Sequence, residues 1–178
     1  MVVLSAQDSD KHINDIAPKF FAEFPNMQAL SHATPAAIEE LISHVRNFGN
    51  KSKWLSELSK KIKDDKKIPI TMAELTELPG IGRKSANVIK RESGAKAEGI
   101  IVDLHVVRVA PRLGIASGTD PKKIVKKQMM DILPQSQWDV GMAMSFLGRE
   151  IFRPTNPKCE ECVMNTVCAY YNSNKNGF

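Results

Sequence analysis

Apolar residues recur every three or four positions along most of the chain, which is the spacing of one face of an α-helix. One apolar stripe covers residues 13–24, a second covers 38–45 and a third covers 55–62. Thr34 and Pro35 precede the second stripe and suit an N-cap and a first helical position. The pattern therefore predicts three helices, each with one buried face.

Two shorter helices are predicted next, with a glycine-containing break between them. Thr71 followed by Glu74 has the form of a capping box, so a helix should begin there and end at residues 78–82. A new helix should run from Arg83 to about Arg91. The chain thus predicts a helix, a tight hairpin and a second helix.

The second half of the chain also has helical spacing. Residues 99–103 suit a short strand, but we prefer Asp103 as the N-cap of a helix that carries Val106 and Val109. Residues 120–132 should form another helix, and Ser136 should open a last long one. The sequence predicts an all-α fold.

Composition sets broad limits on the class of protein. The chain has 178 residues, which suits one domain or two small ones, and its 42% hydrophobic and 25% charged content is that of a folded protein. The net charge of +5 favours a polyanionic partner without proving one. Because there is no apolar run of about 20 residues and no basic leader, we expect a soluble intracellular protein with no membrane partner. We also expect a monomer, cytoplasmic or nucleoid-associated.

All three cysteines lie within ten residues, as Cys159-x2-Cys162-x5-Cys168. An odd, clustered set argues against a disulfide framework. It suggests an intracellular metal site that is one ligand short.

The hairpin at residues 78–82 has a feature of its own. Gly80 and Gly82 flank Ile81, so the backbone can turn tightly and approach another surface closely. Its amides would lie beside the N-terminus of the next helix, which suits a phosphate oxygen and grips nucleic acid without reading its sequence. The alternative is that the glycines only permit a sharp connection.

Four ordered motifs then carry a resemblance that spans the chain. They are Leu-Ser-Ala-Gln at residues 4–7, Leu-Pro-Gly-Ile-Gly-Arg-Lys-Ser-Ala-Asn-Val at 78–88, Val-Asp-Leu-His at 102–105 with Arg108 close behind, and Gly-Arg at 148–149 before the cysteines. Together they resemble the endonuclease III branch of the helix-hairpin-helix DNA glycosylases.

The resemblance implies two helical lobes with a DNA-binding cleft between them. A six-helix lobe would span 1–97 and hold the helix-hairpin-helix motif at 71–91. A second lobe would span 98–178 and hold the cysteine segment at 152–168. Damaged double-stranded DNA would lie in the cleft, and the basic side chains near the hairpin would be Arg83, Lys84, Lys90 and Arg91.

The same resemblance implies that Lys84 is the nucleophile and Asp103 its carboxylate partner. The N-terminus of a helix and the neighbouring Arg83 disfavour an ammonium group, and attack requires a neutral amine. The implied function is a bifunctional DNA glycosylase/AP lyase that removes oxidised pyrimidines and cleaves 3′ to the abasic site through a lysine Schiff base. Taken alone, Lys84 would be a solvated charge and Asp103 a helix cap.

Chemistry on a base requires the nucleotide to leave the stack, and another residue must fill the gap. By position in the family pattern Gln7 fills it. Asn50 replaces the apolar residue of the second wedge, and Phe48 either substitutes for that wedge or belongs to the core. His105 contacts either DNA or the fold itself. The DNA-binding candidates are Gln7, Leu78, Gly80, Ile81, Gly82, Arg83, Ser85 and His105.

The related enzymes hold a four-iron four-sulfur cluster with four cysteines at C-x6-C-x2-C-x5-C. Here the last three match Cys159, Cys162 and Cys168, but the first falls on Phe152, which cannot bind iron. Three interpretations stay open: no cluster, a cluster with another fourth ligand, or an incomplete cluster. Zinc is a weaker alternative, because it also lacks a fourth partner.

Two other functions compete with the bifunctional enzyme. One is a monofunctional or adenine-directed glycosylase of the same superfamily, which the lysine at position 84 opposes. The other is a non-catalytic helix-hairpin-helix DNA-binding module. Family members also carry a helix and a half before the segment that matches residues 2–7, so this chain is shorter at its start.

Overall fold

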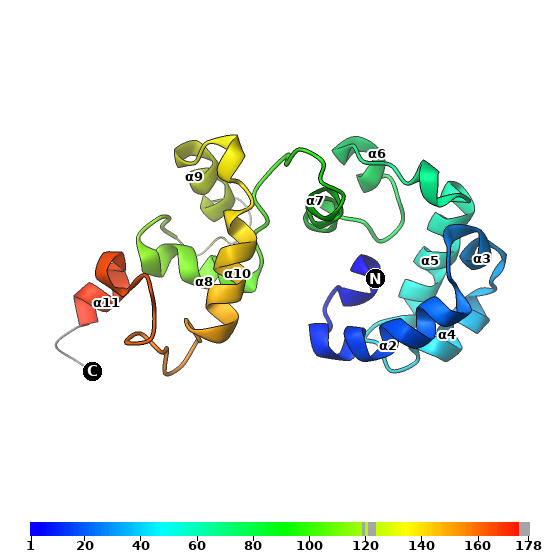
Figure 1. Ribbon diagram of the computed structural model, residues 1–178, viewed down its shortest axis with the longest axis horizontal. Coiled ribbons are helices and arrows are strands. Elements are labelled where there is room, and N and C mark those ends of the chain that lie inside the picture. Colours follow the sequence, from blue (N-terminus) through cyan, green and yellow to red (C-terminus); the bar gives the residue numbers. More distant parts are fainter. Residues whose placement is uncertain (119, 121–123, 175–178) are drawn as a thin grey trace. The chain divides into compact units, whose positions relative to one another are not determined.

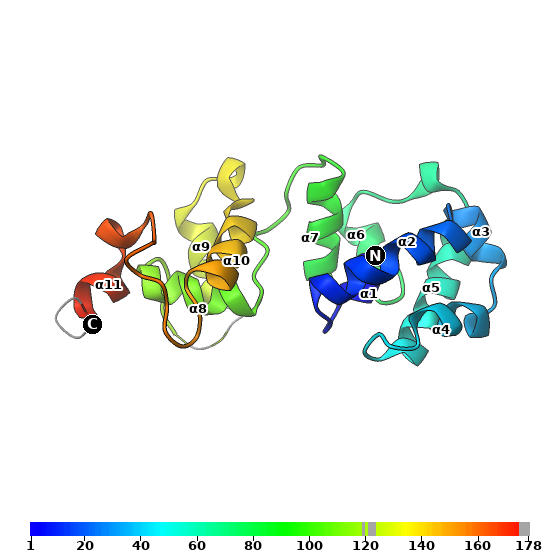
Figure 2. The ribbon, with the colours of Figure 1, turned by 60° about the horizontal axis from the view of Figure 1, so that its bottom comes forward.

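The computed structural model describes residues 1–118, 120 and 124–174, and within these ranges every regular element is a helix (Figures 1 and 2). The all-α prediction is confirmed. The chain divides into two compact units, Met1–Ala95 and Lys96–Phe178. None of the helices described is both long and apolar enough to span a bilayer.

The first unit contains all the helices that the sequence predicted there, and two short ones that it did not, α1 and α3. Thr34 accepts a hydrogen bond from the Ala37 amide, and Thr71 both accepts one from the Glu74 amide and donates to the Glu74 carboxylate, so both predicted caps are present. The elements are α1 (Val2–Ser5), α2 (Asp10–Glu23), α3 (Met27–His32), α4 (Pro35–Ile42), α5 (Phe48–Ile62), the 3-10 turn η1 (Asp65–Lys67), α6 (Met72–Thr76) and α7 (Arg83–Glu92).

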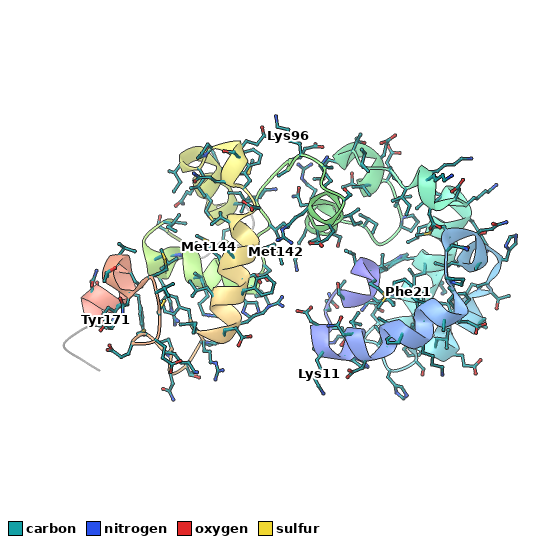
Figure 3. All side chains as sticks on the ribbon, in the orientation of Figure 1. Lys11, Phe21, Lys96, Met142, Met144 and Tyr171 are labelled. Carbon is teal, nitrogen blue, oxygen red and sulfur yellow. The ribbon has the colours of Figure 1, made fainter. Side chains whose placement is uncertain are left out.

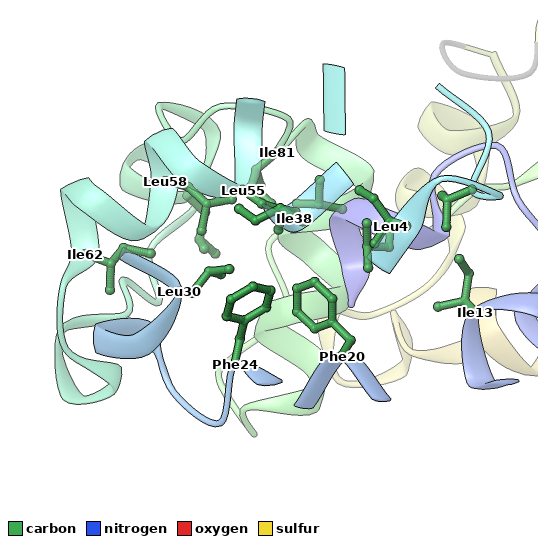
Figure 4. Close-up of a cluster of buried hydrophobic side chains, with 14 of the residues drawn as sticks. Leu4, Ile13, Phe20, Phe24, Leu30, Ile38, Leu55, Leu58, Ile62 and Ile81 are labelled. Carbon is green, nitrogen blue, oxygen red and sulfur yellow. The ribbon is translucent and has the colours of Figure 1, made fainter. Parts of the chain in front are cut away.

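The predicted apolar stripes meet in one core within this unit (Figure 4). Phe20 and Phe24 of the α2 stripe pack edge to face, with ring centroids 5.3 Å apart. Val45 lies beyond the end of α4, yet it is buried as its place in the stripe predicted. The short helix α1 contacts α2, α5 and α7, so its burial depends on all three (Figures 1 and 2).

The second unit is built around α8 and α10, which pack against each other along their length. Met144 projects from α10 into the apolar core of this unit (Figure 3). The elements are α8 (Leu104–Leu113), α9 (Ile124–Ile132), the 3-10 turn η2 (Gln135–Gln137), α10 (Val140–Glu150), the 3-10 turn η3 (Asn165–Val167) and α11 (Ala169–Asn174).

Two predictions for this unit need comment. The last long helix begins at Val140, not at Ser136, because residues 135–137 form a 3-10 turn, which the Trp138 amide closes by donating to the Gln135 carbonyl at 3.2 Å. The Trp138 indole also donates to the Leu133 carbonyl at 3.1 Å. The structure has α9 from Ile124, and Pro121, where that helix was predicted to open, lies outside the described residues.

Two glycines bring α10 close to the start of α8. A Cβ added at Gly148 would lie 2.8 Å from the Cβ of His105 and 3.0 Å from a methyl group of Val109, and one at Gly141 would overlap the Ile101 carbonyl oxygen. A residue larger than glycine would therefore clash at position 141 and at position 148. The close packing places Ser145, which lies between the two glycines on the same helix face, beside the N-terminus of α8.

Candidate active site and nucleic-acid interface

The hairpin between α6 and α7 is held from inside by its apolar side chains. The Ile81 amide donates to the Leu78 carbonyl at 3.1 Å, which closes the turn. The Ile81 side chain is buried in the core, and Leu78 packs against the same core. Leu78 and Ile81 were both predicted to bind DNA. Their side chains support the hairpin from inside, so only their backbone is left to contact a ligand.

The two hairpin glycines serve different needs. Gly80 has φ +76°, and a Cβ there would lie 2.8 Å from the Trp54 ring, so the fold requires glycine. Gly82 has an ordinary φ of −90°, and nothing lies within 4 Å of where its Cβ would be. The fold does not require glycine at position 82, and the space beside it is open to a ligand.

Basic side chains near the hairpin are fewer than the sequence suggested. Arg83 and Lys84 are exposed in the first turn of α7, where the N-cap is Gly82 and no side chain caps the helix. Lys90 is buried and its ammonium donates to the Ile70 carbonyl at 2.8 Å, while Arg91 pairs with Glu92 at 2.6 Å. The exposed charge beside the hairpin thus comes from Arg83 and Lys84, with Ser85 half-buried next to them.

Asp103 is the N-cap of α8, as predicted. Its Oδ1 accepts hydrogen bonds from the amides of His105 and Val106, both at 2.9 Å, and its Oδ2 accepts one from the Ser145 hydroxyl at 2.5 Å. Burial acts to raise the pKa of Asp103, but these hydrogen bonds outweigh it and the pKa lies below the usual value. The side chain is therefore a fixed carboxylate.

Ser145 was not identified from the sequence as a site residue. It is fully buried, and its hydroxyl donates to the catalytic candidate Asp103, while the Arg149 guanidinium lies 3.9 Å from the same carboxylate oxygen. The signal in the sequence was the small residues at 141, 145 and 148, which share one face of a helix. That spacing predicts close helix packing but not which carboxylate lies opposite.

His105 has a contact within the fold. Its Nδ1 lies 3.1 Å from Arg108 Nη2, and the Arg108 guanidinium also donates to the carbonyls of Phe152 and Gly148. This bridge joins α8 to the end of α10. The alternative weighed for His105, a hydrogen bond inside the fold, is present.

Gln7 lies on an exposed turn between α1 and α2, with φ +61°. Phe48, the alternative wedge, is 40% exposed at the start of α5 and so does not belong to the core. Asn50 donates to the side-chain oxygen of Asn47 at 2.9 Å.

The three cysteines are buried and surround one small apolar cavity together with Phe152 and Tyr171. Its volume is about 10 Å³, roughly what a single water molecule requires. Burial raises the pKa of the Cys159 thiol, and the nearby Cys168 and Cys162 add to the effect. Across the described ranges, no set of three or more Cys, His, Asp or Glu side chains is arranged to hold a metal ion.

Phe152 occupies the position of the first cluster ligand and has packing partners of its own. Its ring is 3% exposed, lies 5.5 Å from the Tyr170 ring and has the Arg112 guanidinium 5.0 Å from its centroid. Arg112 also lies 4.8 Å from the Tyr170 ring and donates to the carbonyls of Arg153 and Pro154. The residues present do not fit a cluster held by four cysteines.

Comparison with known proteins agrees with this architecture. The HhH-GPD superfamily of base excision DNA repair proteins matches residues 1–135. Endonuclease III of Synechocystis is 35% identical over 93% of this chain and 77% of its own, and that of Bacillus subtilis is 36% identical over 94% and 77%.

Solved structures show the same similarity. One described as a trapped endonuclease III–DNA covalent intermediate superposes with a TM-score of 0.84 and 30% identity, covering 98% of this chain and 83% of its own. A thermostable thymine-DNA glycosylase shares the fold, with a TM-score of 0.79 and 22% identity. The chain therefore belongs to the endonuclease III family, within the helix-hairpin-helix superfamily of base excision DNA repair enzymes.

Proposed function

We propose that this DNA glycosylase is bifunctional: it excises an oxidised pyrimidine from duplex DNA and then cleaves the strand on the 3′ side of the abasic site. The observation that carries this proposal is the exposed Lys84 in the first turn of α7, two residues after the open Gly82. Support also comes from a relative of 30% identity for which a covalent intermediate with DNA is described.

The reaction uses Lys84 as the nucleophile. Its neutral Nζ attacks the sugar C1′, the bond from C1′ to the base breaks, and the proton released by the amine is matched by the one that the departing base takes up. Opening of the sugar ring converts the new bond to a Schiff base and leaves a hydroxyl at C4′. Loss of a proton from C2′ then breaks the bond from C3′ to oxygen, which cleaves the strand.

Asp103 supplies the negative charge in this proposal. A carboxylate held by two amides and a hydroxyl stabilises positive charge that develops on the sugar, without having to reorganise. It also serves as the proton acceptor.

We propose that a monomer binds damaged double-stranded DNA, with contacts from residues 1–97 and from residues 98–178. The backbone at the hairpin, together with Arg83 and Ser85, grips phosphates, and Gln7 fills the space of the extruded nucleotide. The proposed DNA contacts are Gln7, Leu78, Gly80, Ile81, Gly82, Arg83, Ser85 and His105.

For the cysteine segment we propose the first of the three interpretations, in which no four-iron four-sulfur cluster is bound. Phe152, at the position where a fourth thiolate would be needed, packs against both Arg112 and Tyr170, and Arg112 holds the following loop through its carbonyls. Apolar and cation–π contacts thus do the structural work at this position.

Lys84→Gln tests the lyase directly. Wild-type protein incubated with an abasic-site duplex and borohydride should form a covalent adduct, because borohydride reduces the Schiff base. Lys84→Gln should form none, while Lys66→Gln, which changes an exposed lysine elsewhere in the first unit, should behave as wild type. Release of a damaged base without any adduct would indicate a monofunctional glycosylase, and DNA binding with neither would indicate a non-catalytic module.

Gly82→Ala should weaken DNA binding without weakening the fold. A methyl group at the open position would occupy the space proposed for a phosphate, and a loss of about tenfold in affinity, ~1.4 kcal/mol, is expected by fluorescence anisotropy. Thermal unfolding should be unchanged. Gly80→Ala is the matched contrast, because its positive φ and the Trp54 contact should lower stability by about 1–3 kcal/mol. Equal destabilisation by both variants would contradict the distinction.

Ser145→Ala should change the pH dependence of strand cleavage. The Ser145 hydrogen bond helps to keep the pKa of Asp103 below its usual value, so the rate should fall only when acid protonates this low-pKa carboxylate. Loss of the donor raises that pKa, and the acid limb of the rate profile should move to higher pH. Ser59→Ala, another buried serine whose hydroxyl bonds its own helix, is the control. An acid limb that does not move would show that protonation of Asp103 does not control the rate of strand cleavage.

Metal analysis tests the proposal for the cysteine segment. Freshly purified protein should be colourless and contain no stoichiometric iron or acid-labile sulfide. Cys159→Ser should then cost only the burial of its hydroxyl, about 1–3 kcal/mol, and leave a folded protein, while Arg112→Ala should lower the free energy of unfolding by about 1–2 kcal/mol through the lost ring and carbonyl contacts. Stoichiometric iron and sulfide, lost in Cys159→Ser, would show a cluster with an unusual fourth ligand.

A further inference from the structure

The turn that carries Gln7 is held in a conformation that its sequence does not favour. Gln7 has φ +61°, in the left-handed region that residues with a side chain seldom adopt. Ala6 ends α1 in an extended conformation, and Ser9 begins α2 as its N-cap. The contacts on both sides of Gln7 must therefore hold the turn, since glycine is not there to relax it.

On the N-terminal side, the contact is a buried lysine. Lys51 lies in α5 and is 1% exposed, and its ammonium donates to the carbonyls of Leu4 at 2.8 Å and Ala6 at 2.6 Å. Carbonyls at the end of a helix have no partner within the helix, so the ammonium both satisfies them and fixes where α1 ends. Burial lowers the pKa of Lys51. Burying a cation costs free energy, and an apolar side chain could pack against the four-residue helix without that cost.

On the C-terminal side, the contact is the Asp8 carboxylate. It accepts hydrogen bonds from the Arg46 amide, the Ser9 amide and the His12 ring nitrogen, each at 2.8 Å. These bonds lower the pKa of Asp8 to about 2, so it stays ionised. Arg46 lies just before α5 and Lys51 lies near the start of α5, so the residues on either side of Gln7 are tied to one part of the unit.

We infer that Lys51 is a positioning residue for base extrusion: with Asp8 it fixes the turn at residues 6–8, so that Gln7 enters the DNA stack as a rigid support. The inference rests on the proposed function. A side chain that replaces a nucleotide works against the closing of the stack, and a turn free to move would yield. Lys51 reaches neither the sugar nor the base in this role, because its ammonium is used by the two carbonyls.

The discriminating experiment compares two substrates. Strand cleavage is measured in single turnover on an abasic site in a duplex and on the same site in a single strand, where no paired stack has to be held open. Lys51→Met should slow cleavage of the duplex by about tenfold or more and of the single strand by less than about twofold, as should Gln7→Ala. Lys53→Met, an exposed lysine on the same helix, is the matched control and should behave as wild type on both.

The double variant Lys51→Met/Gln7→Ala makes the test specific. If Lys51 acts through Gln7, the double variant should cleave the duplex no more slowly than Gln7→Ala alone, because the two losses are not additive. Circular dichroism checks the fold, and if Lys51→Met does not fold, Asp8→Asn at the other anchor takes its place.

Equal slowing on both substrates, additive losses with Gln7→Ala, or an unchanged duplex rate would each overturn the positioning role. A wild-type protein that cleaves neither substrate would instead remove the proposed lyase, and this inference with it. The two failures are therefore distinguishable.

Discussion

The carboxylate of Asp103 is the constraint on which the second unit depends. One of its oxygens begins α8 by accepting two amides, and the other accepts the hydroxyl of Ser145 from α10. Gly148 lets α10 approach α8 without a Cβ atom between them, and Gly141 lets it approach Ile101 just before α8, which brings Ser145 within reach of Asp103. The same contact therefore starts a helix, aligns α10 with α8 and helps to keep the pKa of the Asp103 carboxyl below its usual value.

In the first unit, side chains hold two exposed backbone segments in place: the hairpin at residues 78–82 and the turn at Gln7. In the hairpin the apolar side chains point inward, so the open positions at Gly82 and the start of α7 are left for a ligand. In the turn at Gln7 polar contacts do the same work, since Lys51 and Asp8 tie down the residues on either side. Both sets of contacts hold exposed backbone in place from the protein interior.

Much of this could be predicted from the sequence, because helical periodicity, capping residues and the glycine hairpin are local signals. The cap at Asp103 is an example, and so is the buried Val45 beyond the end of α4. The residues that the sequence did not reveal are those whose role depends on distant partners. In the sequence Lys51 resembles the solvated lysines near it, and only the structure shows that it donates to carbonyls at the end of α1. Ser145 likewise resembles a small packing residue, and only the structure shows that it donates to Asp103 at the start of α8. Lys90 was misjudged for the same reason, since only the fold shows that its ammonium reaches the Ile70 carbonyl.

Under the proposal that no cluster is bound, side-chain contacts hold the loop of the cysteine segment in place of metal bonds. A metal cluster joins separated parts of a chain through four strong bonds, and loss of one ligand would leave three thiolates whose mutual repulsion favours protonation. Burial and the neighbouring cysteines already raise the pKa of Cys159 in this direction. Neutral thiols are compatible with an apolar cavity. Phe152 lines the same cavity, at the position where a charged ligand would be needed. Arg112 then supplies what packing alone lacks, because its guanidinium contacts two rings and also satisfies two loop carbonyls. One arginine thus links the same stretch of chain that a first cluster ligand would have anchored.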